Sequence, residues 1–340
     1  MPYPPEDRAP PVVEPIVELA RAKINLTLKI LGRRADGYHE LQSLVAFAAA
    51  GDVVTLTPTG PGSNPAFAVE VTGPYGSAIV GDNLVVKTLH AVENSAGRPL
   101  AARLILEKHL PVASGIGGGS ADAAAVLRAL QRAYPELRTA VDWQQIAASL
   151  GADVPVCLAS RPAWMTGIGE QLHPVVLPRL EIVLANPGVP VPADKTRRVF
   201  QALVAKPLAG EPSGATAAAT ALPTRLARQD VLDLMQRHGN DLEAAATSVT
   251  PAIAAVKAAL SASPGCLAAT LSGAGPTVVG VFASEREAAA AAARLAARHP
   301  QWWLTATHTA TVPDATVPDA TVPAATVPAA TVPAATVPAA

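Results

Sequence analysis

Residues 111–125 read Pro-Val-Ala-Ser-Gly-Ile-Gly-Gly-Gly-Ser-Ala-Asp-Ala-Ala-Ala, a glycine-rich segment that runs directly into a helical pattern ending near Ala133. Glycines let backbone N–H groups converge, and the start of a helix adds free N–H groups and the positive end of a dipole. Ser120 is a natural N-cap for this helix. The pattern predicts a cradle for a phosphate group, with a flexible hinge before a capped helix as the alternative.

The common phosphate-binding motifs do not fit this segment. It lacks Gly-x-x-x-x-Gly-Lys-(Ser/Thr), and Ser120 stands where the dinucleotide-binding pattern has Gly or Ala. His-Arg-Asp and Asp-Phe-Gly, which mark protein kinases, are also missing. A second glycine turn, Leu271-Ser-Gly-Ala-Gly-Pro-Thr, lies between two strand-like segments. Alone it is a tight turn, but it has the composition to pack beneath the first loop and close a phosphate site.

Several polar residues interrupt apolar surroundings. Asp153 stands alone in Leu-Gly-Ala-Asp-Val-Pro-Val-Cys, where an acid is either a helix cap or a functional group in a partly dry site, and capping is the commoner role. Lys23 and Asn25 share one face of an alternating strand, which for a lysine is usually the solvent face. Tyr38 and His39 follow an Asp-Gly turn, where surface exposure is the usual outcome and ligand recognition the rarer one.

Strands and helices follow one another without regular alternation, which predicts an α+β fold. Strands are expected over 16–30, 52–57, 66–72, 103–107, 181–185, 266–271, 277–282 and 303–307. Helices are expected over 83–93, 120–133, 143–150, 194–203, 242–260 and 285–298, with a long loop over 205–223.

Composition narrows the class of protein. The 340 residues allow two domains, but residues 1–15 and the six Thr-Val-Pro-(Asp/Ala)-Ala repeats of residues 311–340 hold twelve of the 33 prolines. A formal net charge of −1 gives no excess of basic residues for binding nucleic acid or an anionic membrane. The two cysteines have no disulfide or zinc spacing, and neither a signal peptide nor a membrane-spanning run is visible. These features predict a soluble cytoplasmic protein with disordered ends.

Taken together, the motifs resemble those of the GHMP kinase superfamily. They are Ala22-Lys-Ile-Asn-Leu-Thr-Leu, Arg34-Ala-Asp-Gly-Tyr-His-Glu-Leu-Gln-Ser, Pro111–Ala124, Leu150-Gly-Ala-Asp-Val-Pro-Val and Leu271-Ser-Gly-Ala-Gly-Pro-Thr-Val, with Asn240-Asp-Leu-Glu as a further match. Within the superfamily the resemblance is to the kinases that use ATP to phosphorylate the 2-hydroxyl of 4-diphosphocytidyl-2-C-methyl-D-erythritol in the non-mevalonate isoprenoid pathway. It covers roughly residues 17–305.

The resemblance implies a role for each matching residue. Asp153 corresponds to the catalytic aspartate and Lys23 to the lysine beside it. Tyr38, His39 and Phe200 correspond to residues that hold the cytosine, and Asn25 to a polar substrate contact. The ATP site would comprise Asn83 and Lys108 near the base and ribose, together with the phosphate loop: Pro111, Val112, Ala113, Ser114, Gly115, Ile116, Gly117, Gly118, Gly119, Ser120 and Ala121.

The resemblance also implies the architecture and the partners. An N-terminal domain like the second domain of ribosomal protein S5 (residues 16–165) would precede a ferredoxin-like domain (166–308), with extensions at 1–15 and 309–340 and the active site between the domains. ATP and Mg²⁺ are expected, with no assigned metal ligand, in a monomer or weak homodimer. Ala121 and Ala274 depart from the family pattern, where polar residues are usual. Another GHMP kinase, a catalytically silent binding protein on the same fold and, more distantly, a dehydrogenase remain the alternatives.

Overall fold

The structure is a computed structural model that describes residues 14–59, 67–79, 83–192, 194–203 and 222–311. The expected N-terminal extension up to residue 13, most of the expected loop over 205–223 and the repeats from residue 312 lie outside these ranges. The strands are β1 (Ile16–Arg33), β2 (His39–Pro58), β3 (Phe67–Thr72), β4 (Ala102–Glu107), β5 (Ala163–Gly167), β6 (Gln171–Pro174), β7 (Glu181–Asn186), β8 (Cys266–Leu271), β9 (Val278–Phe282) and β10 (Trp303–His308). The helices are α1 (Leu84–Ala96), α2 (Gly118–Ala133), α3 (Trp143–Leu150), α4 (Val154–Ala159), α5 (Lys195–Ala202), α7 (Arg228–His238), α8 (Glu243–Val249), α9 (Ala252–Ser261) and α10 (Glu285–Arg298).

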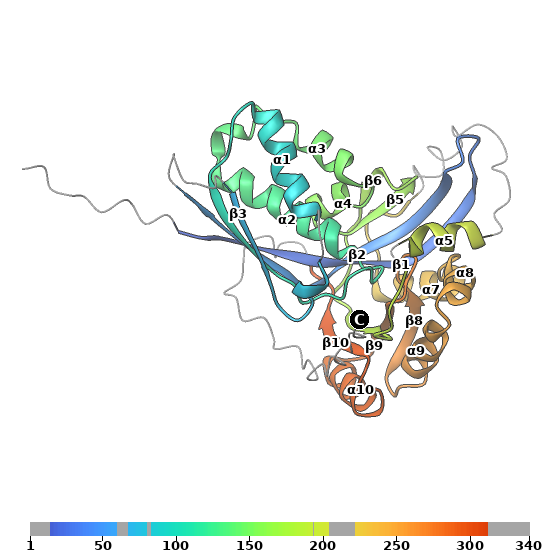
Figure 1. Ribbon diagram of the computed structural model, residues 1–340. Coiled ribbons are helices and arrows are strands. Elements are labelled where there is room, and N and C mark those ends of the chain that lie inside the picture. The colour runs from blue at the N-terminus through green and yellow to red at the C-terminus, as the bar shows by residue number, and fades with distance from the viewer. Residues whose placement is uncertain (1–13, 60–66, 80–82, 193, 204–221, 312–340) are drawn as a thin grey trace, which may run out of the picture.

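The long strand β2 organises the first sheet. It pairs antiparallel with β1, β4 and β5, and β3 and β6 extend the sheet at its two ends, giving six strands. Helices α1 to α4 lie together on one side of this sheet (Figure 1). The first half of β2 was not expected as a strand, because its apolar run over residues 44–48 is buried on both faces and shows no alternation.

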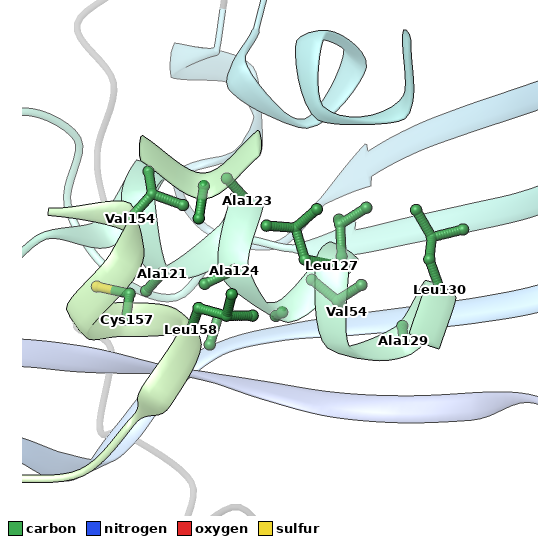
Figure 2. Packing of buried hydrophobic residues seen from close by; sticks show 14 of the residues in the cluster. Val54, Ala121, Ala123, Ala124, Leu127, Ala129, Leu130, Val154, Cys157 and Leu158 are labelled. Carbon is green, nitrogen blue, oxygen red and sulfur yellow. The ribbon is translucent and has the colours of Figure 1, made fainter. Parts of the chain in front are cut away.

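Helix α2 packs closely on its neighbours because its buried face consists largely of alanines. Ala121, Ala123 and Ala124 are buried, and Figure 2 shows this face turned toward Val154 and Leu158 of α4. Small side chains let two helices approach, and a close-packed interior fixes their relative position. The start of α2 and the start of α4 are therefore held at a defined separation.

The second sheet has the strand order β10-β7-β9-β8, and each adjacent pair is antiparallel. With helices between β7 and β8 and between β9 and β10, this is the ferredoxin-like arrangement that was expected. Helices α9 and α10 pack against this sheet (Figure 1). The α+β, two-domain architecture is thus confirmed.

One hydrophobic cluster joins the two sheets. Ile24 and Leu26 of β1 are fully buried in the same cluster as Ile182 of β7 and Val281 of β9. Every residue of β1 from 22 to 28 is buried, on both faces of the strand, so the expectation of a solvent face for Lys23 is wrong.

One expected helix differs from the structure in its extent. The single helix expected over 242–260 is two helices, α8 and α9, because Pro251 disfavours helical backbone at Thr250, whose φ is −135°.

The domain boundary expected at residue 165 falls inside β5, and β6 still belongs to the first sheet. We therefore propose a boundary after Pro174. Helices α4 and α7 were not expected, because the first is only six residues long and the second carries few apolar residues.

Candidate active site

A cleft of about 630 Å³ lies between the two parts of the chain. Its walls include Lys23, Asn25, Ser43, Asn83, Lys108, Asp122, Asp153 and Met165 from the first part, and Lys195, Thr196, Phe200, Leu242, Gly273 and Ala274 from the second. Most of the glycine-rich loop also lines it. The cleft thus gathers residues that lie up to about 250 positions apart in the chain.

Lys23 and Asp153 form an ion pair at the wall of this cleft. The Nζ atom of Lys23 donates to Oδ1 of Asp153 at 2.6 Å, with 6% of the lysine side chain and 36% of the aspartate side chain exposed. Asp153 is the residue before α4, but its carboxylate makes no capping hydrogen bond to that helix. The capping role that the sequence favoured is therefore wrong, and the carboxylate is available to a ligand.

An irregularity in β1 places Lys23. The pairing with β2 shifts between Arg21 and Lys23, so the backbone N–H of Lys23 donates not to β2 but to the carbonyl of Ile116, at 2.9 Å. Gly117 lies directly against the lysine stem, where an added Cβ would come within 3.0 Å of the Lys23 Cβ. The strand and the glycine-rich loop are thus joined at the residue that pairs with Asp153.

The glycine-rich loop enters α2 in the geometry of a phosphate cradle. Gly117 is the N-cap with φ +65°, a left-handed conformation that favours glycine, and α2 begins at Gly118. The expectation that Ser120 caps the helix is wrong, because Ser120 lies inside the first turn. Gly118, Gly119 and Ser120 line the cleft, and N–H groups in a first helical turn have no partner within the helix. Ile116 and Ala121, also assigned to this loop, are instead buried in the hydrophobic clusters.

The second glycine turn packs beneath the first loop, as the sequence suggested. Ser272 Oγ donates to the Gly115 carbonyl at 3.1 Å and accepts from the backbone N–H of Asn25 at 3.1 Å. Gly115 has φ +80°, and a Cβ there would come within 2.4 Å of the Gly275 carbonyl oxygen. Two glycine turns and β1 therefore support one another behind the cleft.

Lys108 is buried between two carboxylates. Its ammonium pairs with Asp52 and, at 2.6 Å, with Asp122. Burial alone lowers the pKa of Lys108, but the two carboxylates outweigh it and raise this pKa above its ordinary value. Burial raises the pKa of Asp122 well above its ordinary value, against the opposing effect of Lys108. The ammonium lies beneath Gly118, since a Cβ on that residue would be 3.2 Å from it.

The two asparagines assigned to the site both line the cleft. Asn83 is the N-cap of α1, and its Oδ1 accepts from the backbone N–H of Val86 at 2.9 Å. Asn25 donates from Nδ2 to Ser43 Oγ at 2.8 Å, while its buried Oδ1 has no partner in the described structure. An unpaired buried acceptor is costly, which suits a contact that a ligand completes.

The residues assigned to cytosine are only partly brought to the cleft. Phe200 lines it, and its ring centroid lies 5.1 Å from that of His39 with 33° between the planes. Tyr38 is 59% exposed, and neither Tyr38 nor His39 is among the described residues that line the cleft. Burial, with a smaller effect from Arg33, lowers the pKa of His39.

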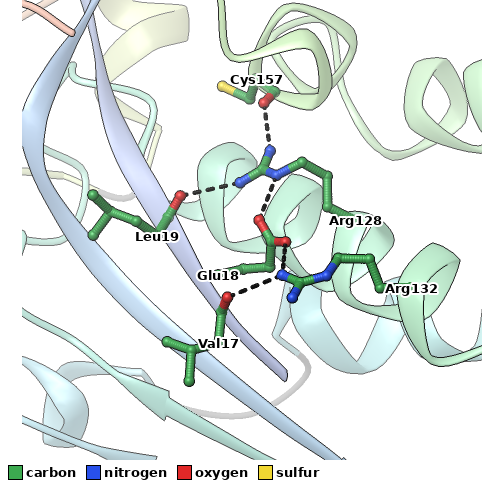
Figure 3. A network of polar contacts seen from close by, with 6 residues as sticks. All are labelled: Val17, Glu18, Leu19, Arg128, Arg132 and Cys157. Carbon is green, nitrogen blue, oxygen red and sulfur yellow. Dashed lines mark hydrogen bonds and ion pairs between the residues drawn. The ribbon is translucent and has the colours of Figure 1, made fainter. Parts of the chain in front are cut away.

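An arginine network ties the elements of the site together (Figure 3). Arg128 of α2 donates to Glu18 of β1 at 2.8 Å, to the Leu19 carbonyl at 3.1 Å and to the Cys157 carbonyl in α4 at 2.9 Å. Arg132, one turn further along α2, also reaches Glu18, at 2.9 Å. The strand that carries Lys23, the helix after the phosphate loop and the helix after Asp153 thus share one polar junction.

Lys195, Asp52 and Asp122 were not expected at the site from the sequence. Asp122 belongs to the quoted loop motif, so its position in that motif was a usable signal. For Asp52 the only signal is weak, namely an acid directly before a run of β-branched residues. Lys195 carries no local signal, because only the folded chain places it against both glycine turns.

Comparisons with known proteins show similarity over most of the chain. Residues 83–161 match the family described as GHMP kinases N terminal domain, and residues 224–301 match the one described as GHMP kinases C terminal. The chain is 47% identical over 293 residues to a protein from Parvibaculum lavamentivorans named 4-diphosphocytidyl-2-C-methyl-D-erythritol kinase, with 85% of this chain and 97% of that protein covered. A Bradyrhizobium protein with the same name is 45% identical over 298 residues, with 86% and 96% covered. A crystal structure of 4-(cytidine 5'-diphospho)-2C-methyl-D-erythritol kinase, 33% identical, superposes with a TM-score of 0.66 and covers 87% of this chain and all of that one.

Proposed function

The chain belongs to the 4-diphosphocytidyl-2-C-methyl-D-erythritol kinase family of the GHMP kinases, and from this premise we propose the reaction that its cleft performs. The γ-phosphoryl group of ATP is transferred to the 2-hydroxyl of 4-diphosphocytidyl-2-C-methyl-D-erythritol, a step of the non-mevalonate route to isoprenoids. The observation that carries the proposal is the Lys23–Asp153 pair, at 2.6 Å, in a cleft that the phosphate loop also lines.

Asp153 is the general base in this proposal. Lys23 donates to one oxygen of the Asp153 carboxylate and so fixes the orientation of this group. The carboxylate accepts the proton of the substrate hydroxyl as the hydroxyl oxygen attacks the γ-phosphorus of ATP. Lys23 also brings a positive charge to the place where negative charge moves during transfer. Phosphoryl transfer depends mainly on positioning and charge stabilisation, and this pair contributes to both.

The glycine-rich loop holds the triphosphate. The N–H groups of the first turn of α2 and the positive end of its dipole attract phosphate oxygens, and Ser120 adds a hydroxyl in the same turn. Lys108 lies beneath Gly118, where Asp52 and Asp122 balance its charge, so we assign it to supporting the base of the loop. Asn83, at the start of α1, borders the cleft where the base and ribose of ATP are expected.

A magnesium ion would neutralise charge on the phosphates. In the described residues no three His, Cys, Asp or Glu side chains come together as a metal site. Mg²⁺ commonly keeps several waters and binds through substrate phosphates with one or two protein groups. Ser120 lines the cleft in the first turn of α2, and its hydroxyl is the protein group that we assign to such an ion.

Cytosine recognition is assigned to Phe200, Tyr38 and His39. Phe200 already borders the cleft and offers a ring face, and stacking on an aromatic side chain contributes about 1–3 kcal/mol per base. His39 does not line the cleft, but its ring is in contact with that of Phe200, which does. A substrate hydrogen bond from His39 discriminates cytosine from bases that leave it unpaired.

Some expectations about the cellular setting belong to the same proposal. None of the described helices is long and apolar enough to cross a bilayer. A cytoplasmic protein that acts as a monomer or weak homodimer, without nucleic acid or membrane partners, is what we propose for this enzyme.

The test is ADP release from Mg-ATP by the purified full chain with three alcohols offered in parallel. We expect turnover with 4-diphosphocytidyl-2-C-methyl-D-erythritol and none with mevalonate or homoserine. Turnover with one of the other alcohols alone would keep the kinase fold but remove the cytidyl substrate. No ADP release with any of the three alcohols would support a binding protein without catalytic activity.

A further inference from the structure

Lys195, the first residue of α5, holds its ammonium group between the two glycine turns. It donates to the carbonyl of Ala113 in the phosphate loop at 2.9 Å and to the carbonyl of Gly275 in the second turn. Only 4% of the residue is exposed, yet it lines the cleft. An ammonium has three protons, so two bonds to carbonyls leave one donor for a ligand.

The charge of Lys195 is not balanced by an acid. Lys23 and Lys108, the other lysines of the cleft, each pair with a carboxylate, whereas Lys195 forms no ion pair with any residue that the structure describes. Asp194, its neighbour in sequence, is occupied by Arg197 and Arg198 at 2.6 and 2.8 Å. A buried charge is unfavourable until a counter-charge reaches it. Burial accordingly lowers the pKa of Lys195 to about 8.

The described elements packed around Lys195 bring no unpaired titratable group to it. Residues 111–115 and 271–276 carry none. Helix α8, which packs on α5, contributes Glu243, and that carboxylate is bound to Lys257 at 2.6 Å. The remaining charged groups that line the cleft, Lys23, Lys108, Asp122 and Asp153, are paired among themselves. A change in charge at this place near pH 8 therefore belongs to Lys195.

We propose that Lys195 binds a phosphate oxygen of a nucleoside diphosphate group in the cleft, while its other two donors hold the two glycine turns together. The inference rests on the proposed function, since both substrates of that reaction carry such a group. It names a contact that the sequence did not assign. The diphosphate belongs either to ATP or to the cytidyl substrate, and separate probes distinguish these sources.

The experiment is calorimetric titration of the full chain with Mg-ADP and, separately, with CDP, from pH 7 to 10 at constant ionic strength. Wild type is compared with Lys195→Met, Lys195→Arg and the control Arg197→Met, which removes a cation from the exposed face of the same helix. A charge-assisted hydrogen bond to phosphate contributes about 1.5–3 kcal/mol, so Lys195→Met should weaken binding of its ligand at pH 7 by about 10- to 150-fold. Arg197→Met should leave it unchanged.

The pH dependence of ligand affinity distinguishes a phosphate contact of Lys195 from a purely structural role of this residue. Protonated Lys195 binds the anion, so wild-type affinity should fall above pH 8, by up to about tenfold per pH unit. Lys195→Met should be insensitive to pH over this range, and Lys195→Arg should keep its affinity at pH 10, because arginine stays charged.

A loss confined to Mg-ADP assigns Lys195 to the ATP phosphates, and a loss confined to CDP assigns it to the substrate diphosphate. Wild-type affinity for both probes in Lys195→Met, or a loss that keeps the wild-type pH slope, overturns the inference and leaves the proposed function standing. Failure of the wild-type protein to bind either probe would overturn both.

Discussion

At the scale of single residues, Asp153 is where binding and chemistry should separate. Asn in its place keeps the size of the side chain but cannot accept the proton of the substrate hydroxyl. We expect Asp153→Asn to bind Mg-ATP as wild type does and to lose about 10²- to 10⁴-fold in kcat. Equilibrium binding and steady-state rates measure the two effects.

Asp142→Asn is the matched control, because Asp142 caps α3 through a hydrogen bond to the Gln145 N–H at 2.9 Å and Asn is an equally good cap. It should be active. Near-normal turnover in Asp153→Asn would remove Asp153 as the base.

Phe200 provides a second residue-scale prediction. Its ring lines the cleft, so Phe200→Ala should raise the KM for the cytidyl substrate by about 5- to 150-fold, the equivalent of about 1–3 kcal/mol of stacking, while the KM for ATP stays close to wild type. Tyr38→Ala should act in the same direction. Equal effects on both substrates would contradict the assignment of these rings to cytosine.

At the scale of elements, the two glycine turns depend on the missing side chain at Gly115. Gly115→Ala places a Cβ within 2.4 Å of the Gly275 carbonyl in a left-handed backbone conformation, with φ +80°. Strain of this kind costs about 1–3 kcal/mol, so we expect a fall of several degrees in Tm.

Gly119→Ala is the control for this loop, because a Cβ there meets no atom within 4 Å and Ala favours helix. Its Tm should equal or exceed that of wild type. Equal melting temperatures for the two variants would show that the turns do not pack as described.

The arginine junction gives a prediction for the helices. Arg128→Met leaves the carboxylate of Glu18, which is 13% exposed, without its main partner and frees the Cys157 carbonyl, so it should destabilise the fold by about 2–4 kcal/mol. Arg132→Met removes a side chain that is 46% exposed and should cost less than about 1 kcal/mol. Urea denaturation measures both. A larger loss of unfolding free energy in Arg132→Met than in Arg128→Met would show that Arg132, and not Arg128, stabilises the junction.

Elements with a local signal could be predicted from sequence, and those that depend on distant contacts could not. The alternation of β1 and the helical spacing of residues 83–93 were sufficient, and both elements are found. The first half of β2, buried on both faces, and the break at Pro251 within an apolar run were not anticipated. At the site, the positions of Lys23 and Asp153 could be inferred only through the family resemblance, because local rules favoured a surface lysine and a helix cap.

At the scale of the whole molecule, the two sheets share a core. Ile24 of β1 and Val281 of β9 are fully buried in one cluster, and the Ala310 N–H donates to the Phe47 carbonyl of β2 at 2.7 Å. Because neither half can open without exposing this shared surface, the chain should unfold in a single cooperative transition. Differential scanning calorimetry tests this. Two separated transitions would mean that the halves are independently stable.

The position to which phosphate is transferred tests the central claim most directly. The full chain is incubated with Mg-ATP and 4-diphosphocytidyl-2-C-methyl-D-erythritol, and the products are followed by ³¹P NMR. We predict one new phosphomonoester per ADP formed, on the 2-hydroxyl, with the cytidyl diphosphate intact and no such product from Asp153→Asn. ADP without that ester, or a phosphate on another hydroxyl, would contradict the assignment of the cleft.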